Sequence, residues 1–195
     1  MMLAAAVVCV LLTQGDPVVL KGGRVVPVSG PEIESGSVLI VDGRIRAVGA
    51  TVDAPAGTKV IEISKNSWIL PGFIDAHSHL GSSFDIEEPT EPFTPEARAV
   101  EAFTSRHPDV RAAMASGVTC VALSPGNGNL LGGQIGVVRL NGERYDRAVL
   151  RHAVALKASL GADVLRPDRE PTSRTGAVAL LRSRFGPPAA ALPAL

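Results

Sequence analysis

Residues 68–81 read Trp68-Ile-Leu-Pro-Gly-Phe-Ile-Asp-Ala-His77-Ser-His79-Leu-Gly81. The apolar run, with a Pro-Gly kink inside it, predicts a strand that is buried on both faces and ends at the two histidines. Because alternate residues of a strand point to the same side, His77 and His79 are expected to converge, with Asp75 one step further back on that face.

Two converging imidazoles form half of a metal site. Neutral imidazole is a common ligand of divalent ions, and two of them on one strand leave room for further ligands and a water molecule. The pair His77 and His79 therefore predicts a divalent metal, with zinc as the preferred ion. The alternative is that both histidines are polar residues whose hydrogen bonds are satisfied at a strand terminus.

The segment Pro71-Gly-Phe-Ile-Asp-Ala-His77-Ser-His79-Leu-Gly81 resembles the first-strand metal motif of the amidohydrolase superfamily, metal-dependent hydrolases built on a distorted TIM barrel. The resemblance continues through Ala115-Ser-Gly-Val-Thr-Cys-Val-Ala-Leu123 and Leu131-Gly-Gly-Gln-Ile135, which are most similar to imidazolonepropionase-like members. It covers residues 18–185. The implied fold is α/β, the N-terminal part of a TIM-like (β/α)8 barrel preceded by half of a small antiparallel β-sandwich.

The resemblance and the changes in sequence pattern along the chain together predict four segments. Residues 1–15 have the apolar core of a signal peptide, although no basic residue precedes Lys21, and a first buried strand is the alternative. Residues 16–67 form the β-sandwich half, residues 68–185 the partial barrel, and residues 186–195 a low-complexity tail. The expected location is secreted or periplasmic, otherwise cytoplasmic, without a membrane span once the leader is removed.

Composition sets further bounds on function. The chain has 195 residues, 46% of them hydrophobic, and a formal net charge of zero. It is long enough to bury a sizeable core, and its charge gives no reason to expect binding to nucleic acid or to an anionic membrane. Its two cysteines provide neither a disulfide framework nor a cysteine-based zinc module.

Periodicity predicts the elements around the histidine motif. Asp42-Gly43 between two apolar runs predicts a type I′ hairpin. Helices are predicted from Thr94, from Pro108 to Gly117, over Arg147–Lys157, and after Thr172-Ser173, and a strand over Val118–Leu123. The glycine-rich segment Ser124–Gln134 is expected to be a βα-loop at the barrel mouth, and Ile135–Leu140 with Asn141-Gly142 to begin another hairpin.

Other polar residues are weaker candidates. The acidic loop after the motif is expected to be solvated, with contact to a cationic substrate or a second metal as the alternative; its acids are Asp85, Glu87, Glu88 and Glu91. His107 and His152 are expected to be structural or exposed. Lys157 falls in a helix pattern, which disfavours it as a ligand.

A divalent ion at His77 and His79 would activate a water molecule, so the predicted reaction is hydrolysis of an amide or related C–N bond. The superfamily's remaining ligands are a carboxylated lysine or glutamate, two further histidines and a proton-shuttling aspartate, and the resemblance assigns none of them in this sequence. A complete barrel takes about 250 residues, so the chain is expected to be a truncated amidohydrolase. The alternative is a non-catalytic remnant or metal-binding fragment. Expected partners are a small-molecule amide or peptide-like substrate and, as one option, a second copy in a homo-oligomer.

Overall fold

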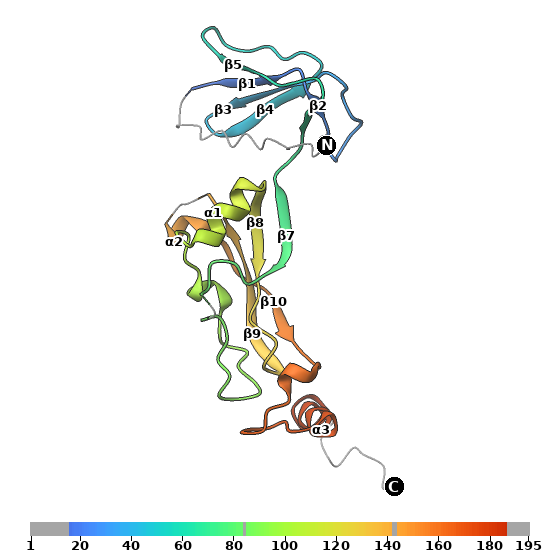
Figure 1. The fold of residues 1–195 in the computed structure, drawn as a ribbon, viewed down its shortest axis with the longest axis vertical. Coiled ribbons are helices and arrows are strands. Elements are labelled where there is room, and N and C mark those ends of the chain that lie inside the picture. The colour runs from blue at the N-terminus through green and yellow to red at the C-terminus, as the bar shows by residue number, and fades with distance from the viewer. Residues whose placement is uncertain (1–15, 84, 142–143, 187–195) are drawn as a thin grey trace, which may run out of the picture. The chain divides into compact units, whose positions relative to one another are not determined.

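A computed structural model describes residues 16–83, 85–141 and 144–186 (Figure 1). The predicted leader, residues 1–15, lies outside the described residues, as does almost all of the predicted tail. Contacts between Cα atoms divide the chain into two compact units, whose described parts are residues 16–72 and residues 73–186. Among the described residues, no helix has the length and apolar character needed to cross a membrane.

Unit 1 is built on a four-stranded sheet with the strand order β4-β3-β1-β5. The strands of unit 1 are β1 (Val18–Lys21), β2 (Arg24–Val25), β3 (Ser37–Val41), β4 (Arg44–Gly49), β5 (Lys59–Glu62) and β6 (Trp68–Ile69). The short strands β2 and β6 form a separate two-stranded sheet. The buried apolar residues of this unit are Val18, Val19, Val25, Val38 and Leu39.

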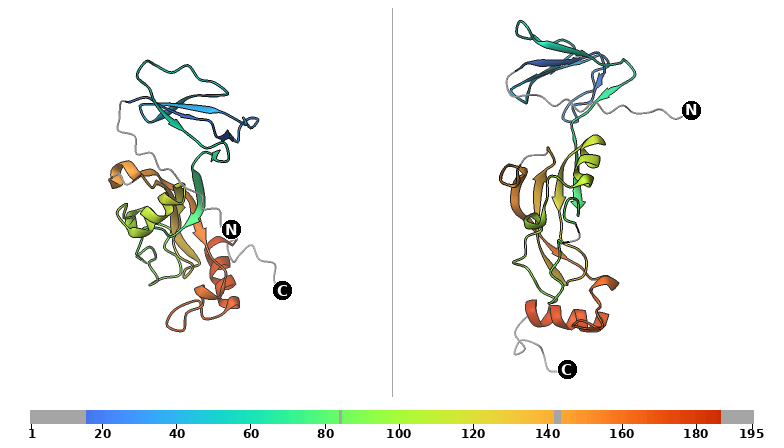
Figure 2. Two further views of the ribbon diagram at one scale, coloured as in Figure 1. Left: turned by 45° about the horizontal axis from the view of Figure 1, so that its top comes forward. Right: turned by 60° about the vertical axis from the view of Figure 1, so that its left-hand side comes forward.

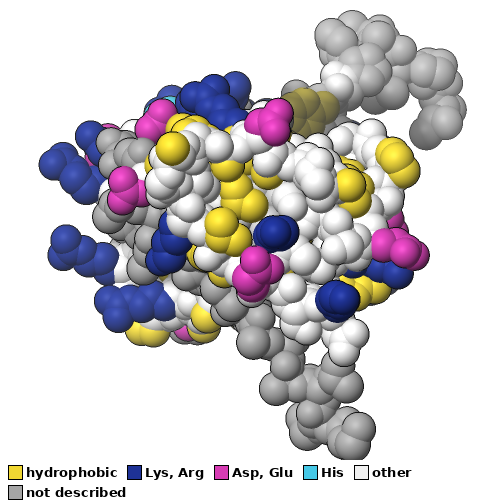
Figure 3. Space-filling view, turned by 90° about the horizontal axis from the view of Figure 1, so that it is seen from above, with side chains coloured by type: hydrophobic (Ala, Val, Ile, Leu, Met, Phe, Trp, Pro, Cys, Tyr) yellow, Lys and Arg dark blue, Asp and Glu magenta, His cyan; other side chains and the backbone are white. Residues whose placement is uncertain are grey.

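The β3–β4 hairpin confirms the prediction made from Asp42-Gly43. Asp42 has φ 52° and Gly43 has φ 67°, so both central residues occupy the left-handed region that a type I′ turn requires. The expectation of a purely antiparallel unit is wrong, because β1 pairs in parallel with β5 and β2 in parallel with β6. In the face that Figure 3 shows, hydrophobic side chains lie among charged ones of both signs.

Unit 2 contains a four-stranded sheet with the order β10-β9-β8-β7. Its strands are β7 (Phe73–Ser78), β8 (Val118–Leu123), β9 (Leu131–Arg139) and β10 (Val149–Ala158). Its helices are α1 (Pro108–Ala115), α2 (Tyr145–Ala148) and α3 (Arg174–Phe185), with 3-10 turns at Ala99–Ala102 and Ala162–Val164. The views in Figures 1 and 2 place α3 at the end of the sheet away from α1.

The first βαβ unit is confirmed. Strand β7 runs parallel to its neighbour β8, and α1 lies in the connection between them. After β8 the sheet becomes antiparallel, because β9 pairs antiparallel with both β8 and β10. Strands β9 and β10 pair antiparallel, as expected of a hairpin after Ile135, but α2 lies in their connection and Gly142 of the predicted turn lies outside the described residues. The loop after β8 leads into a strand and not a helix, so its prediction as a βα-loop is wrong. The described residues form a mixed α/β structure and do not contain a closed barrel.

The main core of unit 2 lies between the sheet and the segments that connect its strands. The 3-10 turn 99–102, helix α1 and strands β8 and β9 contribute to one cluster, in which Val100, Val110, Leu123 and Val138 are each 0% exposed. A second, smaller cluster joins Leu130 to α3. The loop after β7 packs against the first cluster through Leu80 and Ile86, and the loop after β8 contributes Leu130 to the second.

Two helix predictions in unit 2 are wrong for tertiary reasons. Residues 149–158 form β10, because they pair along β9, and only residues 145–148 are helical. Thr94 does not cap a helix, because its N–H donates to the carbonyl of Leu131 and its hydroxyl accepts from Asn129. Helix α1 and the Ser173 cap of α3 confirm the other two helix predictions.

Strand β7 differs from its predicted environment. Every residue of Phe73–His77 is exposed, with Phe73 at 57% and Ile74 at 73%, whereas a strand buried on both faces was expected. Strand β7 is an edge strand that pairs only with β8 among the described residues, and its side chains are exposed on both faces.

Candidate metal centre

The two histidines of the motif lie together at the C-terminal end of β7. His77 is within the strand and His79 follows it directly, and their ring centroids are 5.1 Å apart with the rings nearly perpendicular, at 87°. Ser78 between them pairs with the buried Leu123 of β8, after a register shift between Asp75 and Ser78. The predicted convergence of His77 and His79 is present in the structure.

The orientation of His79 is set by a hydrogen bond to the loop after β8. Its Nδ1 lies 2.8 Å from the carbonyl oxygen of Ser124, a residue that is 0% exposed. A carbonyl oxygen can only accept, so Nδ1 carries the proton and the neutral ring has its lone pair on Nε2. The hydroxyl of Ser82 also donates to the His79 carbonyl oxygen at 2.6 Å. His79 is therefore held in the tautomer that offers Nε2 as a ligand, an arrangement typical of metal-binding histidines.

The surroundings of His77 favour its neutral form. Partial desolvation by burial, the ammonium of Lys157 and the neighbouring His79 lower the pKa of His77, while the carboxylate of Asp75 acts in the opposite direction. Asp75 also accepts a hydrogen bond from the backbone N–H of His77 at 3.1 Å. A neutral imidazole is the form that binds a metal.

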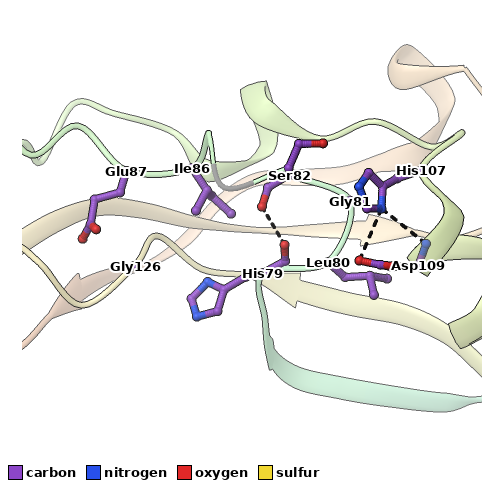
Figure 4. A pocket seen from close by; sticks show the side chains of 10 residues that line it. His79, Leu80, Gly81, Ser82, Ile86, Glu87, His107, Asp109 and Gly126 are labelled. Atoms are coloured by element: carbon purple, nitrogen blue, oxygen red, sulfur yellow. Dashed lines mark hydrogen bonds and ion pairs between the residues drawn. The ribbon is translucent and has the colours of Figure 1, made fainter.

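A cavity of about 480 Å³ lies beside His79 (Figure 4). Its lining residues are His79, Leu80, Gly81, Ser82, Ser83, Ile86, Glu87, His107, Asp109 and Gly126. In the close-up, His107 and Asp109 lie at the end of the cavity away from Glu87. The cavity provides space next to one imidazole of the motif, as a small substrate would need.

The structure places the weaker candidates as follows. His107 is the N-cap of α1 and its Nδ1 accepts the N–H of Asp109 at 3.3 Å, which confirms a structural role. His152 is exposed on β10 and does not line the cavity. Lys157 lies near the end of β10, not on a helix, and acts on the pKa of His77. Sequence reasoning missed this proximity because the pattern of residues 147–157 had suggested a helix.

The acidic loop is only partly solvated. Asp85 and Glu91 are exposed, and the Glu88 carboxylate accepts from Thr90 in its own turn. Glu87, however, accepts from the backbone N–H of Gly128 at 2.5 Å, across from its own loop. No local sequence signal pairs residue 87 with residue 128, so this contact could not be found from the sequence.

The donor set fits one part of a metal site. Within the described ranges of the chain, no group of three or more His, Cys, Asp or Glu side chains is placed to hold an ion. The chain thus supplies two imidazoles, one of them with its ligating nitrogen fixed, and a lysine close to the other. Two imidazoles suit zinc, and the remaining coordination positions would come from other groups.

Known proteins with similar sequences include dihydroorotases and adenine deaminases. The chain is 33% identical over 110 residues to a dihydroorotase of Anaeromyxobacter dehalogenans, covering 56% of this chain and 22% of that protein. It is 39% identical over 72 residues to an adenine deaminase of Deinococcus deserti, covering 37% of this chain and 12% of that protein. No family model matches.

Among solved structures, an amidohydrolase from Thermotoga maritima is similar with a TM-score of 0.78 and 28% identity, covering 86% of this chain and 46% of the other. The chain therefore spans less than half of that structure and less than a quarter of the two relatives named above. The match in sequence, the match in fold and the paired histidines agree: the chain resembles members of the amidohydrolase superfamily over an N-terminal portion of their length.

Proposed function

We propose that this chain carries the first half-site of a metal-dependent hydrolase that acts on amide or other C–N bonds. The observation that carries the proposal is the hydrogen bond from His79 Nδ1 to Ser124, which leaves Nε2 free beside the converging ring of His77. Relatives named dihydroorotase and adenine deaminase support this reaction class.

The roles of the residues follow from their chemistry. A divalent ion, for which zinc is the best match, would activate a water molecule and polarise the substrate carbonyl. His77 and His79 would bind the ion through neutral imidazoles. Lys157 becomes a candidate for the lysine ligand that the resemblance implies, because it lies on a strand and close enough to His77 to lower its pKa.

The wider setting is part of the same proposal. Strand β7, helix α1 and strand β8 would open a TIM-like barrel, and residues 16–67 would be half of a β-sandwich. The substrate would be a small amide or peptide-like molecule bound in the cavity beside His79. The proposal also includes export directed by a leader over residues 1–15, and assembly into a homo-oligomer.

The first experiment is metal analysis of the purified protein by plasma mass spectrometry. We expect near-stoichiometric zinc or another transition metal in the wild type and its loss in the His77→Ala/His79→Ala double variant. His152→Ala is the matched control, because it removes an exposed imidazole that does not line the cavity, and it should retain the metal. A wild type without metal after reconstitution would contradict the half-site.

A second candidate is a metal-binding remnant without catalysis. It is favoured by one observation, that the described residues bring no third His, Cys, Asp or Glu ligand to the pair. Screening the zinc-loaded protein, in its full natural length, against ring amides, dipeptides and N-acetyl amines separates the two candidates. Turnover that a chelator and His77→Ala both abolish supports the hydrolase, whereas metal binding without turnover supports the remnant.

A further inference from the structure

The carboxylate of Glu87 rests on the loop that follows β8. Its Oε1 accepts the N–H of Gly128 at 2.5 Å, and both Glu87 and Gly126 line the cavity beside His79. In Figure 4 the Glu87 side chain points toward the Gly126 segment. Two loops that are far apart in the sequence are thus joined next to the candidate metal ligand.

The two glycines of this loop are explained by the carboxylate. A Cβ built on Gly126 would lie 2.7 Å from Glu87 Oε2, and one on Gly128 would lie 2.9 Å from the same atom. Neither glycine has a positive φ, so the backbone at both positions would accept other residues. For each glycine, the three nearest atoms to the added Cβ all belong to Glu87. The absence of side chains at these two positions therefore makes room for Glu87.

The same loop sets the orientation of His79. Ser124, two residues before Gly126, supplies the carbonyl oxygen that accepts from His79 Nδ1. The backbone of Gly128 is held through both of its polar groups, since its N–H donates to Glu87 and its carbonyl oxygen accepts from the Arg169 guanidinium at 2.7 Å. A loop anchored in this way presents the Ser124 carbonyl at a fixed position.

We propose that Glu87 is a positioning residue, which holds the 124–128 loop so that Ser124 keeps His79 in its Nδ1–H tautomer. The expected effect of Glu87 on zinc affinity rests on the proposed function. The link from Glu87 through Ser124 to the His79 tautomer does not. The linkage can be measured without metal, so its failure and the failure of the metal proposal are distinguishable.

The first test measures the loop and the ring in metal-free protein by NMR. In Glu87→Ala, exchange of the Gly128 amide hydrogen should accelerate on the order of ten-fold, the effect of losing one hydrogen bond to a charged group. The Nε2–H tautomer of His79 should become populated, which a purely structural role of Glu87 would not produce. Glu87→Gln keeps the acceptor oxygen and should restore both wild-type readings.

The matched control is Glu88→Ala, which removes the neighbouring carboxylate, bound to Thr90 in its own turn. It should leave the Gly128 exchange rate and the His79 tautomer unchanged. An unchanged tautomer in Glu87→Ala, or the same change in Glu88→Ala, would overturn the proposal.

A second test uses the glycines. In Gly126→Ala the new methyl group should displace the Glu87 carboxylate, and the Gly128 amide should exchange as fast as in Glu87→Ala. The double variant Glu87→Ala/Gly126→Ala should match either single variant, because both changes break one contact. Additive effects would mean that Gly126 acts independently of Glu87, and the proposal would fail. Zinc titration then adds the functional readout, with a roughly ten-fold weaker Kd expected in Glu87→Ala.

Discussion

Asn129 is the polar residue whose removal should cost unit 2 the most. Its side chain is 0% exposed, donates to the Glu88 carbonyl at 2.7 Å and to the Thr94 hydroxyl at 2.9 Å, and accepts from Arg169 at 2.7 Å. Asn129→Ala removes these three hydrogen bonds from the interior of unit 2. We expect a loss of about 2–3 kcal/mol in the free energy of unfolding, measured by chemical denaturation.

Asn127 provides the control for that substitution within the same loop. It is exposed, so Asn127→Ala should change the free energy of unfolding by less than about 0.5 kcal/mol. Equal effects of the two substitutions would show that the Asn129 hydrogen bonds contribute nothing specific, and that residue 129 acts only through the conformation of the loop.

The pKa of His77 is the second property that belongs to single residues. Burial lowers it from the ordinary value of 6.5, and Lys157 lowers it further. Lys157→Met should therefore raise the pKa of His77, followed by NMR titration, whereas Arg151→Met, on the same strand and exposed, should not. Because the pKa of His77 is lower in the folded state, the unfolded state binds the proton at a higher pH as the pH falls. The stability that neutral His77 contributes above about pH 6.5 should be lost as the pH falls through the folded-state pKa.

Among the secondary-structure elements, the β3–β4 hairpin depends on the backbone of Gly43. A Cβ at Gly43 would meet no atom within 4 Å, so Gly43→Ala tests only the cost of its φ of 67°. We expect a loss of about 1 kcal/mol in the denaturation free energy of unit 1. Gly30 is the matched control, because a Cβ there also meets nothing within 4 Å and its φ is not positive. Destabilisation of the same size by Gly30→Ala would contradict the turn explanation.

Elements with strong local signals could be predicted from the sequence. The Asp42-Gly43 turn, the β8 strand, helix α1 after Pro108 and the Ser173 cap each depend on residues that are neighbours in the chain. Strand β10 could not be predicted, because the apolar and charged residues of Arg147–Lys157 suit a helix locally. Pairing with β9 decides the conformation instead.

In the candidate site, too, local features could be predicted from the sequence and long-range contacts could not. His77 and His79 converge because they are two residues apart on one extended segment, which the sequence shows directly. The hydrogen bonds from His79 to Ser124 and from Gly128 to Glu87, and the electrostatic effect of Lys157 on His77, join segments more than 40 residues apart. Such contacts depend on strand order and loop packing, for which a single sequence contains no local signal.

At the scale of the whole molecule, the sheet of unit 2 ends in two strands with exposed apolar side chains. Strands β7 and β10 are its edges, and Ile74, Phe73, Val154 and Leu156 are 73%, 57%, 53% and 45% exposed. Relatives extend well beyond the matched region, and the Thermotoga maritima structure is about twice as long as the part covered here. The exposed strands are the surface against which further barrel strands would pack in the proposed fold.

Such edges should make the 195-residue chain associate with itself when it is expressed alone. Unpaired strands with apolar side chains are templates for pairing with another copy, and a charge on the edge opposes that pairing. Sedimentation velocity should show oligomers that grow with protein concentration in the wild type and decrease in Ile74→Lys. Leu160→Lys is the control, because Leu160 is 64% exposed but lies outside the strands, so it should not reduce association. A wild type that stays monomeric at high concentration would show that the edges are protected, and an equal effect of both lysines would indicate a general effect of charge.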